Sequence, residues 1–131
     1  SCVLRISGVS VPVFQEPPAE WPFLPDQQIE FVHRDDAVNA IVGGVIAELS
    51  DSTRVINVSG GVSWRMTGSQ YVADYFGMIE VDPEEAIYQS KPGHFSWYAD
   101  EGGNASLGYQ QNPYPLYLKQ LQDDINRLME E

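Results

Sequence analysis

Two apolar segments separated by a longer helical pattern constrain the fold of this chain most strongly. Residues 2–13 are rich in Val, Ile and Leu and predict a buried strand ending near Val9, and residues 54–59 predict a second strand. Between them, residues 35–49 repeat apolar side chains at three- and four-residue spacing, typical of a helix with one apolar face. This order predicts an α/β fold, with a connection long enough for a right-handed parallel crossover.

Later segments predict two more helices. Thr67 and Gln70 fit a capping box, so we expect a helix from there to Phe76, with Gly77 as its stop. A longer helix is expected over residues 114–129. Its apolar face would consist of Leu118, Leu121, Ile125 and Leu128.

A Pro-rich segment follows the first strand. Residues 15–26 hold too many prolines for a helix or a central strand, so they predict a loop. Trp21, Phe23 and Leu24 lie within it. Three large apolar side chains favour a loop that docks on the protein over one that extends into solvent.

A His and two carboxylates lie where a short strand, residues 30–33, turns into the first helix. Helix N-termini leave N–H groups unpaired, and Asp35 or Asp36 can cap them while suiting the helix dipole. We therefore expect both carboxylates to be structural. His33 is expected to be a buried corner residue that hydrogen bonds to the backbone.

Size and charge restrict the classes of function. The 131 residues suffice for a single unit, 1–131, with its own core. A net charge of −12 disfavours nucleic acid and anionic membranes as partners. The sequence contains neither a signal peptide nor the roughly 20 apolar residues of a membrane span, so we expect a cytoplasmic protein. Cys2 has no disulfide partner, and no His/Cys cluster predicts a metal site.

Several segments resemble one enzyme family. Residues 31–36, Phe-Val-His-Arg-Asp-Asp, resemble the C-terminal signature of the extended short-chain dehydrogenases, the NAD-dependent epimerase/dehydratase family, with Arg34 in place of the usual Val. Three other segments follow in the family's order. They resemble its strand bearing substrate-site residues (3–12), its late Gly-rich strand (55–61) and its Leu-Gly-Tyr turn (107–110).

The resemblance implies a C-terminal fragment of a Rossmann-type enzyme, comprising the last parallel strands and the small substrate-binding domain. The family's Gly-rich phosphate loop and its Tyr-x-x-x-Lys catalytic pair are both absent. We therefore expect no catalytic residue in this chain and no bound cofactor. NAD or NADP would be bound by the full-length parent. A start within a strand, without Met, also favours a piece of a longer chain.

Candidate substrate contacts follow from the same resemblance. They are Ser10 and Val11 at the strand end, Trp21 in the loop, and Arg34 and Arg65, whose guanidinium groups suit an anionic substrate. The substrate would be a small molecule such as a nucleotide sugar, although few basic residues are present to pair with a diphosphate. The other expected partners are the chain's own N-terminal Rossmann portion or a second copy in a homodimer.

A different interpretation stays open at this point. The chain would then be a stand-alone acidic α/β module that binds proteins through an aromatic surface. That surface would consist of Trp21, Phe23, Trp64, Trp97 and Tyr98. A fragment separated from a Rossmann partner would also expose apolar area, so exposure alone does not separate the two hypotheses.

Overall fold

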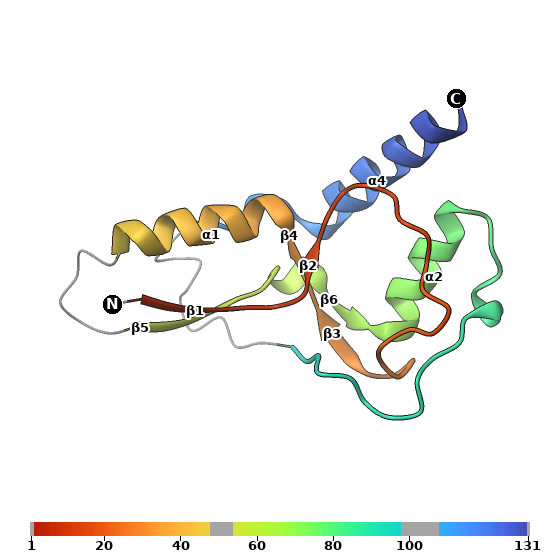
Figure 1. Cartoon of the computed structure of the whole chain (residues 1–131), viewed down its shortest axis with the longest axis horizontal. Coiled ribbons are helices and arrows are strands. Elements are labelled where there is room, and N and C mark those ends of the chain that lie inside the picture. The colour runs from red at the N-terminus through yellow and green to blue at the C-terminus, as the bar shows by residue number, and fades with distance from the viewer. Residues whose placement is uncertain (1, 48–53, 98–107, 131) are drawn as a thin grey trace.

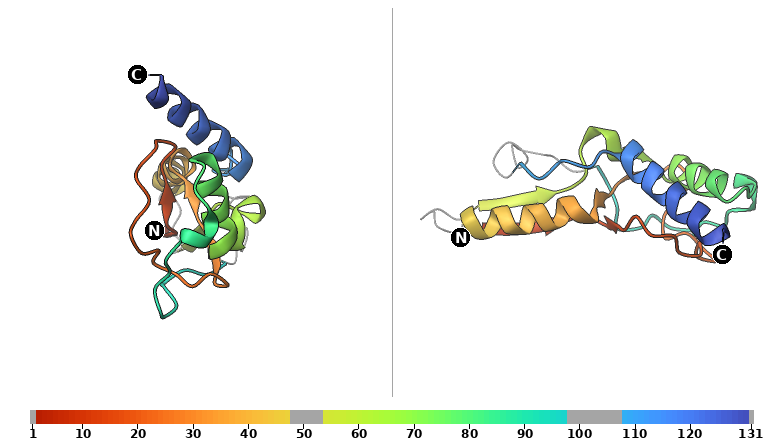
Figure 2. Two further views of the ribbon diagram at one scale, coloured as in Figure 1. Left: turned by 90° about the vertical axis from the view of Figure 1, so that its right-hand side faces the viewer. Right: turned by 90° about the horizontal axis from the view of Figure 1, so that it is seen from above.

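The computed structural model describes residues 2–47, 54–97 and 108–130 (Figure 1). In chain order, the elements are β1 (Cys2–Ile6), β2 (Val9–Ser10), β3 (Gln28–Glu30), β4 (Val32–His33), α1 (Arg34–Ala47), β5 (Arg54–Val58), the 3-10 turn η1 (Val62–Trp64), β6 (Arg65–Thr67), α2 (Gly68–Met78), the 3-10 turn η2 (Pro83–Glu85) and α4 (Tyr114–Met129). The molecule is elongated, with β1, β5 and α1 at one end and α2 and α4 at the other (Figures 1 and 2).

The predicted strand–helix–strand unit forms the first end. β1 and β5 pair in parallel, in register from Cys2 opposite Arg54 to Ile6 opposite Val58, and α1 lies along them (Figure 1). The expectation of a mixed α/β fold with parallel strands is therefore confirmed.

α1 packs on these strands through its smallest side chains. Ala37 and Ala40 are buried, and a Cβ atom built at Gly44 would lie 3.2 Å from Leu4 Cδ1. The larger apolar residues of the helix point outward: Val38, Ile41, Val42 and Val45 are 47 to 64 % exposed. The predicted apolar face is thus not the packed one, because close approach of the helix to the strands needs Ala and Gly.

The segment predicted as one strand, residues 30–33, is two strands with different partners. β3 pairs antiparallel with β6, and β4 pairs in parallel with β2. Phe31 lies at the break between them. The sequence pattern predicts extended backbone here, but the change of partner depends on where β2 and β6 lie.

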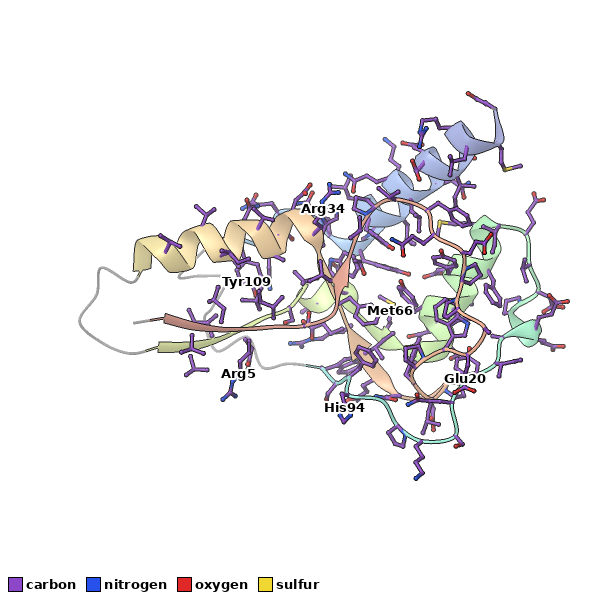
Figure 3. All side chains as sticks on the ribbon, viewed as in Figure 1. Arg5, Glu20, Arg34, Met66, His94 and Tyr109 are labelled. Carbon is purple, nitrogen blue, oxygen red and sulfur yellow. The ribbon has the colours of Figure 1, made fainter. Side chains whose placement is uncertain are left out.

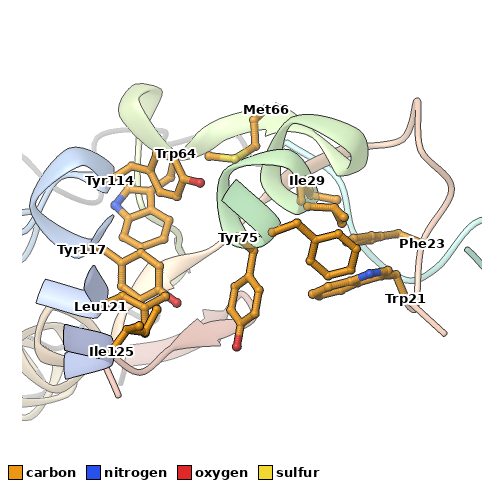
Figure 4. Close-up of a cluster of buried hydrophobic side chains, with 12 residues drawn as sticks. Trp21, Phe23, Ile29, Trp64, Met66, Tyr75, Tyr114, Tyr117, Leu121 and Ile125 are labelled. Carbon is orange, nitrogen blue, oxygen red and sulfur yellow. The ribbon is translucent and has the colours of Figure 1, made fainter. Parts of the chain in front are cut away.

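The second end has an aromatic core (Figure 4). Trp21 and Phe23 from the Pro-rich loop are buried against α2, as the expected docking of that loop requires, and Trp64 packs on Tyr114 and Tyr117 of α4. Leu121 and Ile125 complete the α4 face, whereas Leu128, which was predicted to share it, is 40 % exposed.

The predicted aromatic surface is therefore wrong for most of its members. Trp21, Phe23 and Trp64 are at most 6 % exposed, because the helical end needs their ring area to build a core. Trp97 is 42 % exposed, and Tyr98 lies outside the described residues. Most of the exposed large apolar side chains are aliphatic instead. They include Val38, Ile41, Val42 and Val45 on the outer side of α1 and Val3 and Val55 on the strands.

α2 begins as predicted and ends differently. Thr67 Oγ1 accepts from the backbone N–H of Gln70, and the Gln70 side chain accepts from the N–H of Thr67, which completes the capping box. Gly77 is inside the helix. The left-handed residue is Glu80, with φ of 59°, and the Val81 N–H donates to Phe76 O as in a Schellman motif.

Candidate functional site

A cavity of about 340 Å³ lies beyond the carboxyl end of β1, in the region where ligands bind to open α/β sheets. It is open to solvent on one side and bordered by β2 and the chain that follows it, by α2 and by α4. We call it the aromatic pocket. Its lining consists of Gly8, Val9, Ser10, Val11, Val13, Gln15, Glu16, Pro17, Pro18, Trp21, Phe31, Tyr71, Tyr75, Phe95 and Tyr117.

The structure brings part of the predicted substrate set together. Ser10, Val11 and Trp21 all line the aromatic pocket. Arg34 and Arg65 do not. Arg34 Nε lies 3.0 Å from Asp35 Oδ1, and Arg65 Nε lies 3.1 Å from the buried carboxylate of Glu30.

Four hydroxyl-bearing side chains line the described pocket: Ser10, Tyr71, Tyr75 and Tyr117. The hydroxyls of Ser10, Tyr71 and Tyr117 lie near enough to one another to influence the pKa of the two tyrosines, and the Tyr75 hydroxyl donates to Gln15 O. Burial is the main cause that raises the pKa of Tyr71, Tyr75 and Tyr117 above the ordinary tyrosine value. These phenols therefore stay protonated and neutral at physiological pH, able both to donate and to accept.

Trp21 holds the only indole nitrogen in the described residues that is buried without a partner. Its ring meets Tyr71 and Tyr75 edge to face, with centroid separations of 6.2 and 5.8 Å. The other indoles are satisfied: Trp64 Nε1 donates to Asn112 O at 3.1 Å, and Trp97 Nε1 donates to Met66 O at 3.2 Å.

Sequence analysis missed the other aromatic residues of the pocket. Tyr71 and Tyr75 are four residues apart, so they lie on the same side of α2, and this spacing was a usable signal. Phe31, Phe95 and Tyr117 come from three separate segments. Nothing in their local sequence indicates that they meet.

His33, Asp35 and Asp36 at the strand–helix junction are not in the pocket lining, although the His33 ring meets the lining residue Tyr117 edge to face. His33 is fully buried, its Nε2 is 2.7 Å from Gln120 Oε1, and its Nδ1 accepts the Asp35 N–H at 3.0 Å. The imidazole, rather than a carboxylate, thus accepts an N–H of the first turn of α1. This bond requires an unprotonated Nδ1, so the ring proton is on Nε2 and the Gln120 amide oxygen accepts it.

Asp36 has a different role from the predicted cap. Its buried carboxylate accepts from the backbone N–H groups of Gln111 and Asn112 at 3.1 and 3.0 Å, and from Asn112 Nδ2 at 2.6 Å. These bonds join the start of α1 to the segment that leads into α4. Asp35 is half exposed and its carboxylate faces Arg34, so neither carboxylate caps the helix.

The described residues provide no group of three or more His, Cys, Asp or Glu side chains placed to hold a metal ion. Among them, too, no helix has the length and apolarity needed to cross a membrane.

Solved structures with a similar fold include UDP-sugar epimerases and a dTDP-glucose dehydratase. MoeE5 in complex with UDP-glucose and NAD superposes with a TM-score of 0.73 at 16 % identity, over 98 % of this chain and 48 % of that one. For the UDP-glucose 4-epimerase of Thermotoga maritima the TM-score is 0.67 at 17 % identity, over 98 % and 46 %. The chain has the fold of about half of an NAD-dependent sugar epimerase or dehydratase.

The dTDP-glucose 4,6-dehydratase of Bacillus anthracis in complex with NAD gives a TM-score of 0.69 at 14 % identity, over 98 % of this chain and 45 % of that one. Identities this low show the fold and no more. No protein-family model matches the sequence, and neither does any curated protein. The chain thus spans about half the length of the solved structures that it matches.

Proposed function

We propose that this chain is the substrate-binding, C-terminal part of an NAD(P)-dependent epimerase, dehydratase or reductase, and that it is inactive alone. The observation that carries the proposal is the meeting of Ser10, Val11 and Trp21 in one pocket beyond the carboxyl end of a parallel strand. These are three of the five positions that the family resemblance assigned to substrate; Arg34 and Arg65 are not in the lining. The fold shared with MoeE5, solved with UDP-glucose and NAD, supports the same assignment.

In this function, NAD or NADP in the parent enzyme supplies hydride transfer, and the present chain positions the substrate. The aromatic walls contributed by Trp21, Tyr71 and Tyr75 restrict the orientation of a substrate ring. The neighbouring hydroxyls of Ser10 and Tyr117 hold its polar groups in place. Binding and orientation of this kind lower the entropic cost of reaching the transition state.

The N-terminal Rossmann portion of the parent would cover the exposed aliphatic residues. Val3 and Val55 lie opposite each other on paired strands, and both faces of a parallel sheet are normally covered. Val42 and Val45 on α1 are similarly open. We expect the isolated chain to bind a hydrophobic dye or to pair with a second copy. A dye-free monomer would count against a missing covering domain.

The reading frame of the gene upstream of Ser1 tests the proposal directly. We expect it to encode a Gly-rich phosphate loop after a first strand, and a Tyr-x-x-x-Lys motif before the present chain. If neither motif lies upstream, the proposed function is wrong.

A measurement on the chain itself gives a second test. Millimolar NAD(H) or NADP(H) is expected to leave the thermal midpoint of this chain unchanged, because the sequence lacks the Gly-rich phosphate loop. A ligand that binds only the folded state must raise its stability, so binding would be visible as a rise in the midpoint. A concentration-dependent rise in the midpoint would show that this part alone holds the dinucleotide, contrary to the proposal.

A further inference from the structure

We infer that the aromatic pocket takes an uncharged ring compound bearing hydroxyl groups, such as an aryl glycoside, and discriminates against a nucleoside diphosphate. This inference rests on the proposed function, because it specifies the substrate class of the same site. It separates this chain from its structural neighbours, which include MoeE5 solved with UDP-glucose.

The lining, as far as the described residues form it, lacks the charge that a diphosphate needs. Proteins neutralise phosphate groups with Arg, Lys or helix N-termini. No Lys, Arg or His whose side chain the structure describes is in the lining. The described Lys and Arg side chains are those of Arg5, Arg34, Arg65, Lys91, Lys119 and Arg127.

Several of these cations point away from the pocket or form ion pairs with carboxylates. Arg5 extends from β1 on the side away from α1, and Arg34 lies at the start of α1 (Figure 3). Arg34, Arg65 and Arg127 pair with Asp35, Glu30 and Asp124.

The position of the helix N-termini and the carboxylate of Glu16 also disfavour a bound anion. The first residues of α2 are absent from the lining, and the capping box of Thr67 and Gln70 already satisfies its N-terminus. Glu16 is the ionisable carboxylate in the lining. Its charge, in a protein with a net charge of −12, repels an anion that enters.

The remaining lining suits a neutral ring. Six aromatic side chains surround the cavity: Trp21, Phe31, Tyr71, Tyr75, Phe95 and Tyr117. Aromatic walls bind ring compounds by edge-to-face and offset packing. The volume of about 340 Å³ is at the lower end of the roughly 300–1,000 Å³ usual for ligand pockets, which favours a compact ligand.

Tyrosine and serine hydroxyls supply the polar contacts for such a ligand. Those of Tyr71, Tyr117 and Ser10 lie near one another at the pocket, and each can donate to a ligand hydroxyl or accept from it. Trp21 contributes its ring to the wall, since its unpaired Nε1–H is shielded from the cavity.

The indole N–H signals in a ¹H–¹⁵N NMR spectrum test this inference. The three Trp residues give three signals, and Trp21→Phe identifies the one from the pocket. Phenyl β-glucoside is expected to shift the Trp21 signal, because the Trp21 ring lines the pocket, and to leave the signals of Trp64 and Trp97 unchanged, because neither residue lines it. UDP and UDP-glucose are expected to cause no shift, even at low ionic strength, where attraction to any cation is strongest.

Two variants and one control make the test specific. Tyr71→Phe removes a pocket hydroxyl and is expected to weaken phenyl β-glucoside binding about three- to tenfold, the range for one neutral hydrogen bond. Tyr88→Phe removes a hydroxyl outside the lining and should leave binding unchanged. Glu16→Lys places a cation in the pocket and should create measurable UDP-glucose binding.

The outcomes separate cleanly. Binding of UDP-glucose to the unaltered chain more tightly than phenyl β-glucoside overturns the inference and leaves the proposed function standing. Absence of binding by both probes also overturns the inference. The upstream reading frame tests the proposed function independently of either result.

Discussion

Replacing Asp36 with alanine should destabilise the protein far more than the same change at Asp35. The two carboxylates are adjacent, and both were predicted to serve one helix terminus. In the structure Asp36 is fully buried and accepts three hydrogen bonds from Gln111 and Asn112. Asp35 is half exposed and faces Arg34.

The size of the effect follows from which donors lose their acceptor. Gln111 is exposed, so water can reach its N–H after the substitution, whereas Asn112 is half-buried and loses partners for both its N–H and its side-chain amide. Each buried donor left unpaired costs about 1–3 kcal/mol. We therefore expect Asp36→Ala to lower the free energy of unfolding by about 2–4 kcal/mol.

Urea unfolding followed by circular dichroism measures the difference. Asp35→Ala is the matched control and should change the free energy of unfolding by no more than about 0.5 kcal/mol, as for surface sites. If Asp36→Ala does not fold, Asp36→Asn, which keeps one acceptor oxygen, should give a smaller loss in the same direction. Equal, small effects at both positions would refute the role assigned to Asp36.

Two further predictions concern helix stability and acid sensitivity. Gly77→Ala should raise the free energy of unfolding by about 0.5–1 kcal/mol, measured by thermal unfolding. Position 77 is helical, and a Cβ atom there would meet nothing within 4 Å. Gly68→Ala, whose Cβ would lie 2.5 Å from a backbone oxygen, should destabilise it, and a stabilising result would contradict this packing. Arg127 and the Phe14 N–H lower the pKa of Asp124 below 3.8, so its contribution is present above that pH and is lost as pH falls through the folded value. Asp124→Asn should therefore flatten the acid limb of a stability–pH curve, and an unchanged limb would exclude this contribution.

The strand–helix–strand unit and the capping box of α2 were predictable because their signals are local. The apolar run of residues 2–6 and the pair Thr67 and Gln70 each determine backbone conformation over a few residues. The outer face of α1 was not predictable in this way. Its Val and Ile residues satisfy the helical period, yet the strands pack against Ala and Gly, since inter-element distance selects small side chains.

The sequence likewise predicted some residues of the candidate site and missed others. Sequence resemblance identified Ser10, Val11 and Trp21, and the structure places them in one cavity. It did not identify Tyr117, which is 107 residues from Ser10 in the sequence and joins the pocket only through the packing of α4. Arg34 and Arg65 had the right chemistry for an anion, but neighbouring carboxylates hold them outside the pocket lining.

By itself, the sequence determined the first strand–helix–strand unit, the two later helices, the α/β class and the acidic charge, since each depends on residue type and short-range spacing. Tertiary structure alone decided that His33 accepts an N–H in the first turn of α1, that Asp36 binds the segment before α4, and that the pocket is aromatic, with no cation among the described residues of its lining. The physical reason is that burial and hydrogen-bond partners depend on segments far apart in the chain, and a local pattern carries no record of which segments will meet.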